Sequence, residues 1–245
     1  MANLYLSDNL TGQLSGATAT LEGAEARHAV TVTRVAIGDR VTIGDGLGTI
    51  ATGVVVAATA SVVNIELHVV EFTPQPAPAI WLAQALAKGD RDELAVQAAT
   101  ELGVDGVIPW AAARSISRWE GAKVGKGHER WTSIVREASK QSVRPWLPEV
   151  GPLTTTRQLA ALAETAQLLV LDPLSEVPLT RAETRTQDAR DIVLVVGPEG
   201  GIAPGELELL YGAGAWGASL GSTILRTSTA GPAAIAVLNA KLGRW

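Results

Sequence analysis

Hydrophobic and β-branched residues gather in short runs along the first 70 residues, and glycine turns separate these runs. This pattern is typical of β-strands, which we expect at Arg40 to Ile43, Thr49 to Ala57 and Val62 to Val70. The segment Gly44 to Gly48 lies between the first two runs. It resembles part of a dinucleotide-binding fingerprint, but a strand follows it where that fingerprint needs a helix, so a hairpin turn is the better interpretation. We predict a small N-terminal β-barrel.

From Ile80 onward, apolar runs alternate with segments of helical character. The predicted strands are Ala79 to Leu86, Val104 to Trp110, Leu168 to Leu171 and Ile192 to Val196. The predicted helices are Asp90 to Leu102, His128 to Gln141 and Ala230 to Leu242. Such alternation is typical of a parallel sheet covered by helices, so this region is assigned to the α/β class.

The first of these helices has apolar residues near positions i, i+4 and i+8, which predicts one buried and one exposed face. The residues expected to be buried are Leu94, Ala95, Ala98 and Leu102. The residues expected to be exposed are Asp92, Glu93 and Gln97.

A proline-rich segment, Phe72 to Pro78, separates the β-rich region from the α/β region. Its three prolines stand at alternate positions, which favours an extended, semi-rigid linker. We therefore predict two domains, residues 1–72 and 73–245.

The composition fits a folded chain with one large core or two modest ones, since 47% of the 245 residues are hydrophobic. The absence of cysteine excludes disulfides, a thiolate nucleophile and cysteine-ligated metals. Three histidines are too few for a histidine metal cluster, so no metal is expected. The longest apolar stretch, Ile50 to Val63, is interrupted by polar residues, and the N-terminus has no basic region. We expect a cytoplasmic protein without a membrane span.

The net charge of −5 argues against nucleic-acid binding by the chain as a whole, because binding of polyphosphates depends on lysine and arginine. The distribution of charge changes this picture. Between Arg114 and Trp146 there are eight basic and three acidic residues, whereas the chain up to Glu71 has three basic and seven acidic residues. The basic cluster is interpreted either as an RNA-binding surface or as an ordinary solvated helix face with its loop.

Two segments near the C-terminus are the best candidates for a ligand site. Gly197 to Gly201 reads Gly-Pro-Glu-Gly-Gly and follows the apolar run Ile192 to Val196, while Leu220 to Thr227 reads Leu-Gly-Ser-Thr-Ile-Leu-Arg-Thr. Open α/β sheets bind small ligands at the carboxyl ends of their strands. Glycines there permit positive φ and close approach of the backbone, so main-chain groups can bind an adenine edge. We interpret the first segment as a cofactor loop, with an ordinary turn as the alternative.

A third glycine-rich segment, Gly121 to Gly127, lacks the Ser or Thr that follows the lysine of a phosphate-binding loop. We expect it to be a mobile basic loop. The sequence has no nucleophile elbow and no paired metal ligands.

Several sequence blocks resemble one protein family in the same order along the chain. They are Lys88 to Leu94, Thr100 to Val104, Arg114-Ser115, Glu137 to Ser142 and the two C-terminal segments. Together they resemble the RsmE family, whose members are SPOUT-class methyltransferases that act on small-subunit ribosomal RNA. Glu25 to Asp45 is similar to the PUA-like N-terminal barrel of that family, so the likeness covers nearly the whole chain.

The resemblance implies S-adenosylmethionine as methyl donor and uridine N3 in the decoding region of 16S ribosomal RNA as acceptor, within the small ribosomal subunit. It also implies a homodimer and a SPOUT-type knotted parallel sheet with helices on both faces, beside a small PUA-like β-barrel. The cofactor-binding residues of the family correspond to Leu171, Asp172, Gly197, Pro198, Glu199, Gly200, Gly201, Leu220, Gly221, Ile224, Leu225, Arg226 and Thr229.

Methylation at uridine N3 requires orientation of the acceptor and stabilisation of a developing uracil anion. An arginine suits the second task because its charge is permanent and its donors form a fixed fork. Arg226 and Arg114 are the candidate catalytic residues, with a structural ion pair and a phosphate contact as their respective alternatives. Glu199 is expected to accept from ribose hydroxyls, to hold another loop or to attract the sulfonium. The expected RNA-binding residues are His28, Arg34, Lys88, Arg130, Arg136, Lys140 and Arg144.

Two other functions remain open. Ser228 stands where many members of the family have glutamate, so a noncatalytic ribosome-assembly factor with a cofactor-like pocket is one alternative. The other is a SPOUT enzyme that methylates transfer RNA or large-subunit RNA.

Overall fold

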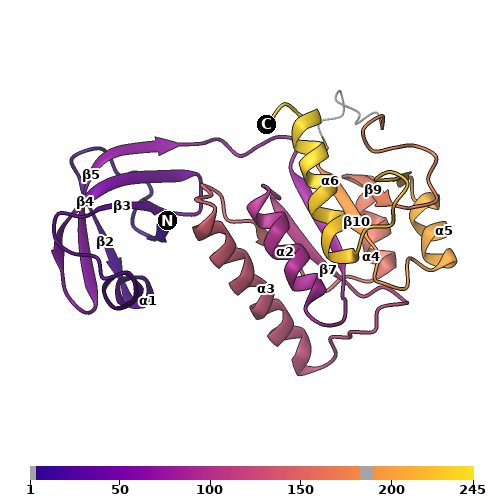
Figure 1. The fold of residues 1–245 in the computed structure, drawn as a ribbon, viewed down its shortest axis with the longest axis horizontal. Helices are drawn as coiled ribbons and strands as arrows, with labels where there is room; N and C mark the ends of the chain where they lie inside the picture. The colour runs from indigo at the N-terminus through magenta and orange to yellow at the C-terminus, as the bar shows by residue number, and fades with distance from the viewer. Residues whose placement is uncertain (1–3, 183–189) are drawn as a thin grey trace. The chain divides into compact units, whose positions relative to one another are not determined.

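The computed structural model describes residues 4–182 and 190–245 of the chain (Figure 1). Its residues divide into two compact units. The first runs up to Gln75 and also includes Ser139–Leu147, whereas the second consists of Pro76–Ala138 and Pro148–Trp245. No helix among the described residues is long and apolar enough to cross a membrane.

The first unit is built on a curled five-stranded sheet with the order β1-β3-β4-β5-β2. Its strands are β1 (Leu4–Leu6), β2 (Thr18–Glu22), β3 (Arg40–Gly44), β4 (Thr49–Ala58) and β5 (Val62–Phe72). β1 pairs with β3 in parallel, and the other neighbours are antiparallel. A short helix, α1 (Gly23–Arg27), and a π-helical turn, η1 (His28–Val32), follow β2. The sheet is open, with β1 and β2 at its edges.

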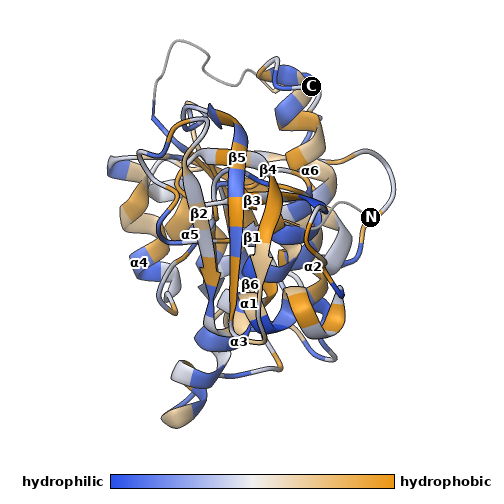
Figure 2. Ribbon diagram, turned by 90° about the vertical axis from the view of Figure 1, so that its left-hand side faces the viewer, coloured by the Kyte–Doolittle hydropathy of each residue, from blue (hydrophilic) through white to orange (hydrophobic). Residues whose placement is uncertain are grey.

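One face of this sheet is the core of the first unit. Figure 2 shows hydrophobic and hydrophilic residues alternating along β5. Val63, Ile65 and Leu67 are buried in the core, whereas Glu66 and His68 between and beyond them are exposed. This period of two is the pattern of an antiparallel sheet with one solvated face.

The segment Gly44 to Gly48 is a hairpin turn, as predicted, and Asp45 holds it together. One carboxylate oxygen of Asp45, Oδ1, accepts the N–H groups of Leu47 and Thr49 at 2.7 and 2.9 Å, and the other accepts the Thr11 hydroxyl at 2.9 Å. Burial raises the pKa of Asp45, but these hydrogen bonds lower it by more, so the net shift is downward. The turn is therefore stabilised by an ionised carboxylate.

Residues 139–147 comprise the end of the basic helix, α3 (Ala122–Gln141), and the segment after it, and they pack in the first unit. The Trp146 indole N–H donates to the Thr73 carbonyl at 2.8 Å. The Gly48 N–H donates to the Pro145 carbonyl at 2.9 Å, and the Leu147 N–H donates to a carbonyl of the same hairpin at 3.0 Å. The chain thus returns to the first unit after it has entered the second, which the division predicted at residue 72 does not include.

The second unit contains a six-stranded parallel sheet with the order β11-β9-β10-β6-β7-β8. Its strands are β6 (Ile80–Ala85), β7 (Gly106–Trp110), β8 (Glu149–Val150), β9 (Gln167–Leu171), β10 (Ile192–Val196) and β11 (Trp216–Ala218). The prediction of a parallel sheet is confirmed. In this order the adjacent strands β9 and β10 lie between β6, which precedes both in sequence, and β11, which follows both.

Helices cover both faces of this sheet. They are α2 (Arg91–Glu101), α3 (Ala122–Gln141), α4 (Thr156–Ala161) with the 3₁₀ turn η2 (Leu162–Glu164), α5 (Pro204–Gly212) and α6 (Thr227–Lys241). Alternate residues of β10 contact different helices, because successive side chains of a strand point to opposite faces. Leu194 packs in a core with α2 and α6, whereas Val193 and Val195 pack in a second core with α4 and α5. Figure 1 shows α2 and α6 side by side, and the two helices are in extensive contact.

The predicted faces of α2 are partly wrong. Leu94, expected to be buried, is 56% exposed, and Asp92, expected to be exposed, is 6% exposed. Asp92 is buried because its carboxylate accepts the backbone N–H groups of Ala87 and Glu93 at 3.2 and 3.0 Å. These hydrogen bonds fix the position of the Asp92 side chain, and they offset the free-energy cost of burying its carboxylate.

The predicted loop from Gly121 to Gly127 is also wrong, because α3 begins at Ala122. Gly127 has a packing role in the helix. A Cβ built there would lie 2.3 Å from Trp119, so the glycine makes room for that ring. Trp119 in turn packs edge-to-face on Trp131 of α3. Tertiary packing therefore overrides the weak helix propensity of glycine.

Candidate cofactor pocket

A cavity of about 700 Å³ lies at the carboxyl edge of the parallel sheet. Segments that follow three neighbouring strands line it: residues 171–174 after β9, residues 196–202 except Gly200 around the end of β10, and most of residues 218–227 after β11. This is the place where open α/β sheets bind ligands. The cavity walls contain the predicted cofactor residues at 171–172, 197–199, 201, 220–221 and 224–226. Gly200 and Thr229 are not among the lining residues.

The glycines of the Gly-Pro-Glu-Gly-Gly loop allow a compact turn at the cavity wall. A Cβ at Gly197 would lie 2.7 Å from the side chain of Ile202. Gly201 has a φ of +71°, and its N–H donates to the Pro198 carbonyl at 2.9 Å. Any other residue at Gly201 would be strained in this left-handed region. The loop therefore presents backbone to the cavity, as the sequence predicts.

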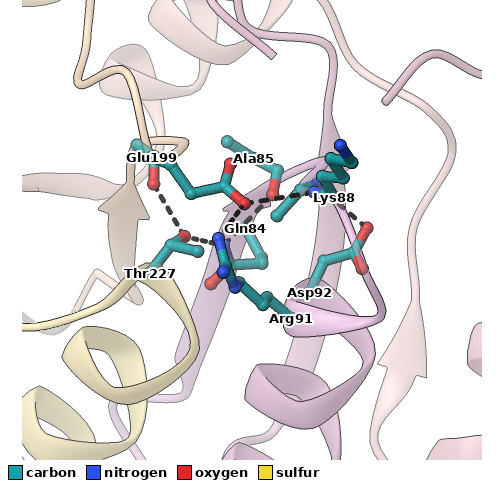
Figure 3. A network of polar contacts seen from close by, with 9 residues as sticks. Gln84, Ala85, Lys88, Arg91, Asp92, Glu199 and Thr227 are labelled. Atoms are coloured by element: carbon teal, nitrogen blue, oxygen red, sulfur yellow. Dashed lines mark hydrogen bonds and ion pairs between the residues drawn. The ribbon is translucent and has the colours of Figure 1, made fainter. Parts of the chain in front are cut away.

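Glu199 connects this loop to the turn between β6 and α2. Its Oε1 atom accepts the Lys88 N–H at 3.2 Å and the Arg91 Nη1–H at 2.9 Å (Figure 3). Burial raises the pKa of Glu199, but hydrogen bonds from its own N–H, Arg91 and Lys88 lower it by more, so the pKa falls below its usual value. Of the three roles expected for Glu199, holding another loop is the one for which the structure has the contacts.

A second set of hydrogen bonds supports the loop through Gln84, a residue that sequence reasoning missed. The fully buried Gln84 amide donates to Thr227 Oγ1 at 2.8 Å, and the Thr227 hydroxyl donates to the Gly197 carbonyl at 2.8 Å. These bonds tie β6, the first residue of α6 and the glycine loop together, and Figure 3 shows Gln84 and Thr227 pointing toward each other. A lone amide in the apolar strand Ile80–Ala85 is the sequence signal for this network.

Asp172, on the wall formed after β9, is held by Tyr211 of α5. The Tyr211 hydroxyl donates to Asp172 Oδ2 at 2.9 Å, and the Leu174 N–H donates to Oδ1 at 2.9 Å. Burial and the negative charge of Asp172 raise the pKa of Tyr211 to about 12. Tyr211 is therefore a neutral donor at physiological pH. No pattern in the sequence indicates this contact.

The two candidate catalytic arginines both lie beside the glycine loop. Arg226 lines the cavity, is exposed and is the N-cap residue of α6. Arg114 comes from the segment after β7, and its Nη1–H donates to the Gly200 carbonyl at 3.1 Å. A Cβ at Gly200 would lie 3.3 Å from Arg114 Cβ, so this glycine makes room for Arg114 rather than for a ligand.

The predicted RNA-binding residues fall in both units. His28, Arg34, Lys140 and Arg144 belong to the first unit, and Lys88, Arg130 and Arg136 belong to the second. Arg34 and Lys88 are exposed, whereas His28, Arg136 and Arg144 are half-buried. Arg130 makes an ion pair with Glu93 at 2.8 Å.

Lys140 requires a correction. Its side chain is buried, with the residue 7% exposed, and its ammonium pairs with Glu25 at 3.2 Å. A buried, paired ammonium is not accessible to an RNA phosphate. Its sequence position within the basic cluster did not indicate that the chain turns back into the first unit there.

Matches to family models cover most of the chain. An RNA methyltransferase domain matches residues 73–239, and an RNA methyltransferase PUA domain matches residues 21–66. The fold and the cavity together define a SPOUT-type RNA methyltransferase with a PUA-like N-terminal sheet.

Comparison with individual relatives identifies the family within this class. A ribosomal RNA small subunit methyltransferase E from Mycobacterium bovis is 38% identical over 250 residues, which cover 100% of this chain and 94% of the relative. The chain therefore belongs to the ribosomal RNA small subunit methyltransferase E family.

Solved structures share the whole fold. The ribosomal RNA small subunit methyltransferase E of Neisseria gonorrhoeae, solved with bound S-adenosyl methionine, is 28% identical, with a TM-score of 0.84 over 98% of both chains. A putative methyltransferase of Legionella pneumophila, solved with the same cofactor, is 26% identical, with a TM-score of 0.82 over 98% of both chains.

Proposed function

We propose that this protein transfers a methyl group from S-adenosylmethionine to N3 of a uridine in the decoding region of 16S ribosomal RNA, within the small ribosomal subunit. Membership of the ribosomal RNA small subunit methyltransferase E family supports the reaction class and the RNA. The observation that carries the proposal is the glycine-lined cavity at the carboxyl edge of the sheet. The position of the modified atom rests on the family resemblance.

The cavity fits S-adenosylmethionine in size and in chemistry. Its volume of about 700 Å³ lies in the range of small-molecule sites. Apolar side chains such as Leu171, Leu220 and Leu225 suit an adenine ring, and the backbone of residues 197–199 and 201 suits the polar edge of that ring. The carboxylates of Asp172 and Glu199 are acceptors for ribose hydroxyls.

When bound, S-adenosylmethionine supplies a methyl group activated by a sulfonium. The residues of this chain have to orient the uridine and stabilise the negative charge that develops on uracil as the N3 proton leaves. We assign that electrostatic role to Arg226, because it is exposed at the cavity wall and the N-terminal end of α6 adds a positive field. Arg114 supports the loop through the Gly200 carbonyl, and its remaining guanidinium donors are assigned to the RNA.

The protein is further proposed to act as a homodimer, as the family resemblance implies. Light scattering of the purified protein checks this, and a monomer at micromolar concentration would contradict it.

Methyl transfer to small ribosomal subunits is the decisive test. The substrates are subunits that lack this uridine methylation, the donor carries a tritiated methyl, and the variant is Gly197→Val, whose side chain would overlap Ile202. We expect incorporation at one uridine N3 with the wild type and at least a tenfold loss with the variant. Incorporation only into transfer RNA or large-subunit RNA would contradict the proposed substrate. Tight subunit binding without incorporation would contradict the proposed enzymatic activity.

Ser228 does not favour the noncatalytic alternative. It is half-buried in the first turn of α6 and is not one of the residues that line the cavity among those the structure describes. The serine at this position therefore changes none of the residues that line the cavity.

A further inference from the structure

The turn between β6 and α2 has an unusual backbone that its own hydrogen bonds stabilise. Gly89 and Asp90 both have positive φ, at +66° and +57°. Such a conformation is costly for Asp90 and persists only where surrounding contacts fix it. Asp92 supplies one of these contacts by accepting the Ala87 N–H at 3.2 Å. The turn therefore has one defined shape when it meets the glycine loop.

Two donors from outside the glycine loop bind Glu199, and both come from this turn and from the helix that follows it. They bind the same oxygen, Oε1, one from the backbone of Lys88 and one from the guanidinium of Arg91. Among the described residues, no hydrogen bond from another residue to Oε2 is found, and Glu199 is exposed. Arg91 and Glu199 both line the cavity. The carboxylate is thus fixed at the cavity wall through one oxygen, and its other oxygen receives no bond from another described residue.

This arrangement matters because a glutamate side chain has three rotatable bonds. A carboxylate that accepts two donors on one oxygen loses most of that freedom before a ligand arrives, so binding costs less entropy. The hydrogen bonds from its own N–H, Arg91 and Lys88 also hold the pKa of Glu199 below its usual value, and an ionised acceptor makes stronger hydrogen bonds to hydroxyl groups.

We infer that Arg91 is a positioning residue for the cofactor: together with the Lys88 N–H it fixes Glu199 Oε1, so that Oε2 is presented to the ribose hydroxyls of S-adenosylmethionine. The inference rests on the proposed function and adds to it the turn between β6 and α2 as part of the cofactor site. Arg91 acts through Glu199 and makes no contact of its own with the reacting atoms.

A double-mutant cycle on ligand binding tests this coupling. The affinity of S-adenosylhomocysteine is measured by calorimetry for the wild type, Arg91→Ala, Glu199→Ala and the double variant. We expect each single variant to bind about 10- to 150-fold more weakly, the range for loss of one charge-assisted hydrogen bond. The double variant should bind no more weakly than Glu199→Ala alone, because without the carboxylate Arg91 has no acceptor to position.

Matched variants separate positioning from simple loss of structure. Arg157→Ala removes an exposed arginine of α4 that does not line the cavity, and it should bind as the wild type does. Arg91→Lys restores a donor and a charge, and it should recover part of the affinity. In methyl transfer, Arg91→Ala should raise KM for S-adenosylmethionine more than it lowers kcat.

The outcomes are distinct. Independent, multiplicative losses in the double variant would show that Arg91 contacts the ligand itself, which overturns the inference. Wild-type affinity in Arg91→Ala would overturn it as well, while leaving the proposed function intact. A wild-type protein that neither binds S-adenosylhomocysteine nor transfers methyl groups would overturn both.

Discussion

Replacing Thr227 with valine should destabilise the protein through two lost hydrogen bonds rather than through a change of shape. Valine has nearly the same volume as threonine, so no cavity forms. The Thr227 hydroxyl bridges the Gln84 amide and the Gly197 carbonyl, at 2.8 Å each, and Thr227 and Gln84 are both buried. Gln84 keeps only its 3.1 Å bond to the Ala85 carbonyl. At about 1–3 kcal/mol for a buried polar group left without a partner, we expect a loss of about 2–3 kcal/mol in unfolding free energy.

Urea unfolding followed by circular dichroism measures this loss, as a lower midpoint at unchanged slope. Adding Gln84→Met should recover about 1–2 kcal/mol, because an apolar partner of similar shape removes the unsatisfied amide, including an Oε1 atom that already lacks a partner. Thr132→Val is the control, since its hydroxyl only binds the exposed backbone of its own helix. The reasoning is refuted if Thr227→Val costs no more than Thr132→Val, or if the two changes at positions 84 and 227 are additive.

Three further predictions follow from contacts described above. Tyr211→Phe should weaken S-adenosylmethionine binding about 3- to 10-fold in calorimetry, because Asp172 at the cavity wall loses the hydrogen bond from the Tyr211 hydroxyl. The pKa of Tyr211 in the folded protein, about 12, lies above the usual 10.0, so the wild type should also lose stability as pH rises from about 10 to about 12. The variant should lack that part of the pH dependence. Lys140→Met should cost about 2–4 kcal/mol of unfolding free energy, because it leaves the charge of Glu25 in a buried site, and should change RNA affinity little in the folded protein; a large fall in affinity at unchanged stability would contradict this. Replacing Arg34 and Lys88 together with alanine should reduce the slope of log affinity for RNA against log salt by about 1 to 2, and an unchanged slope would show that neither contacts phosphate.

The sequence predicted the elements whose signal is local. β10 is found at the predicted bounds because five consecutive apolar residues between an aspartate and a glycine are typical of a strand buried on both faces. The short elements β1, β8, β11, α4 and α5 had no predicted counterpart, since two- and three-residue strands are defined by their partners and α4 and α5 by the core they cover. The buried position of Asp92 was missed for a related reason: its partners are backbone N–H groups, which no pattern of side chains displays.

The residues of the candidate site show the same difference between local and long-range signals. The glycine loop and the segment 220–226 could be found because their residues stand together in the sequence. Gln84 and Tyr211 could not be linked to the site in the same way, because their partners lie 143 and 39 residues away. Only the folded sheet brings these side chains to the same edge, so their support of the loop segments is visible in the structure alone.

The return of residues 139–147 to the first unit limits how the protein can be taken apart. The hairpin at Gly46 and Gly48 receives hydrogen bonds from, or donates them to, this later segment, and Trp146 binds Thr73. A fragment that ends at residue 72 would lack these partners. A fragment that begins at residue 73 would keep the contact between Trp146 and Thr73 but would lose the hairpin that residues 145 and 147 bind. In a chimera with a relative, the N-terminal unit is exchangeable only as two separate stretches of chain transplanted together.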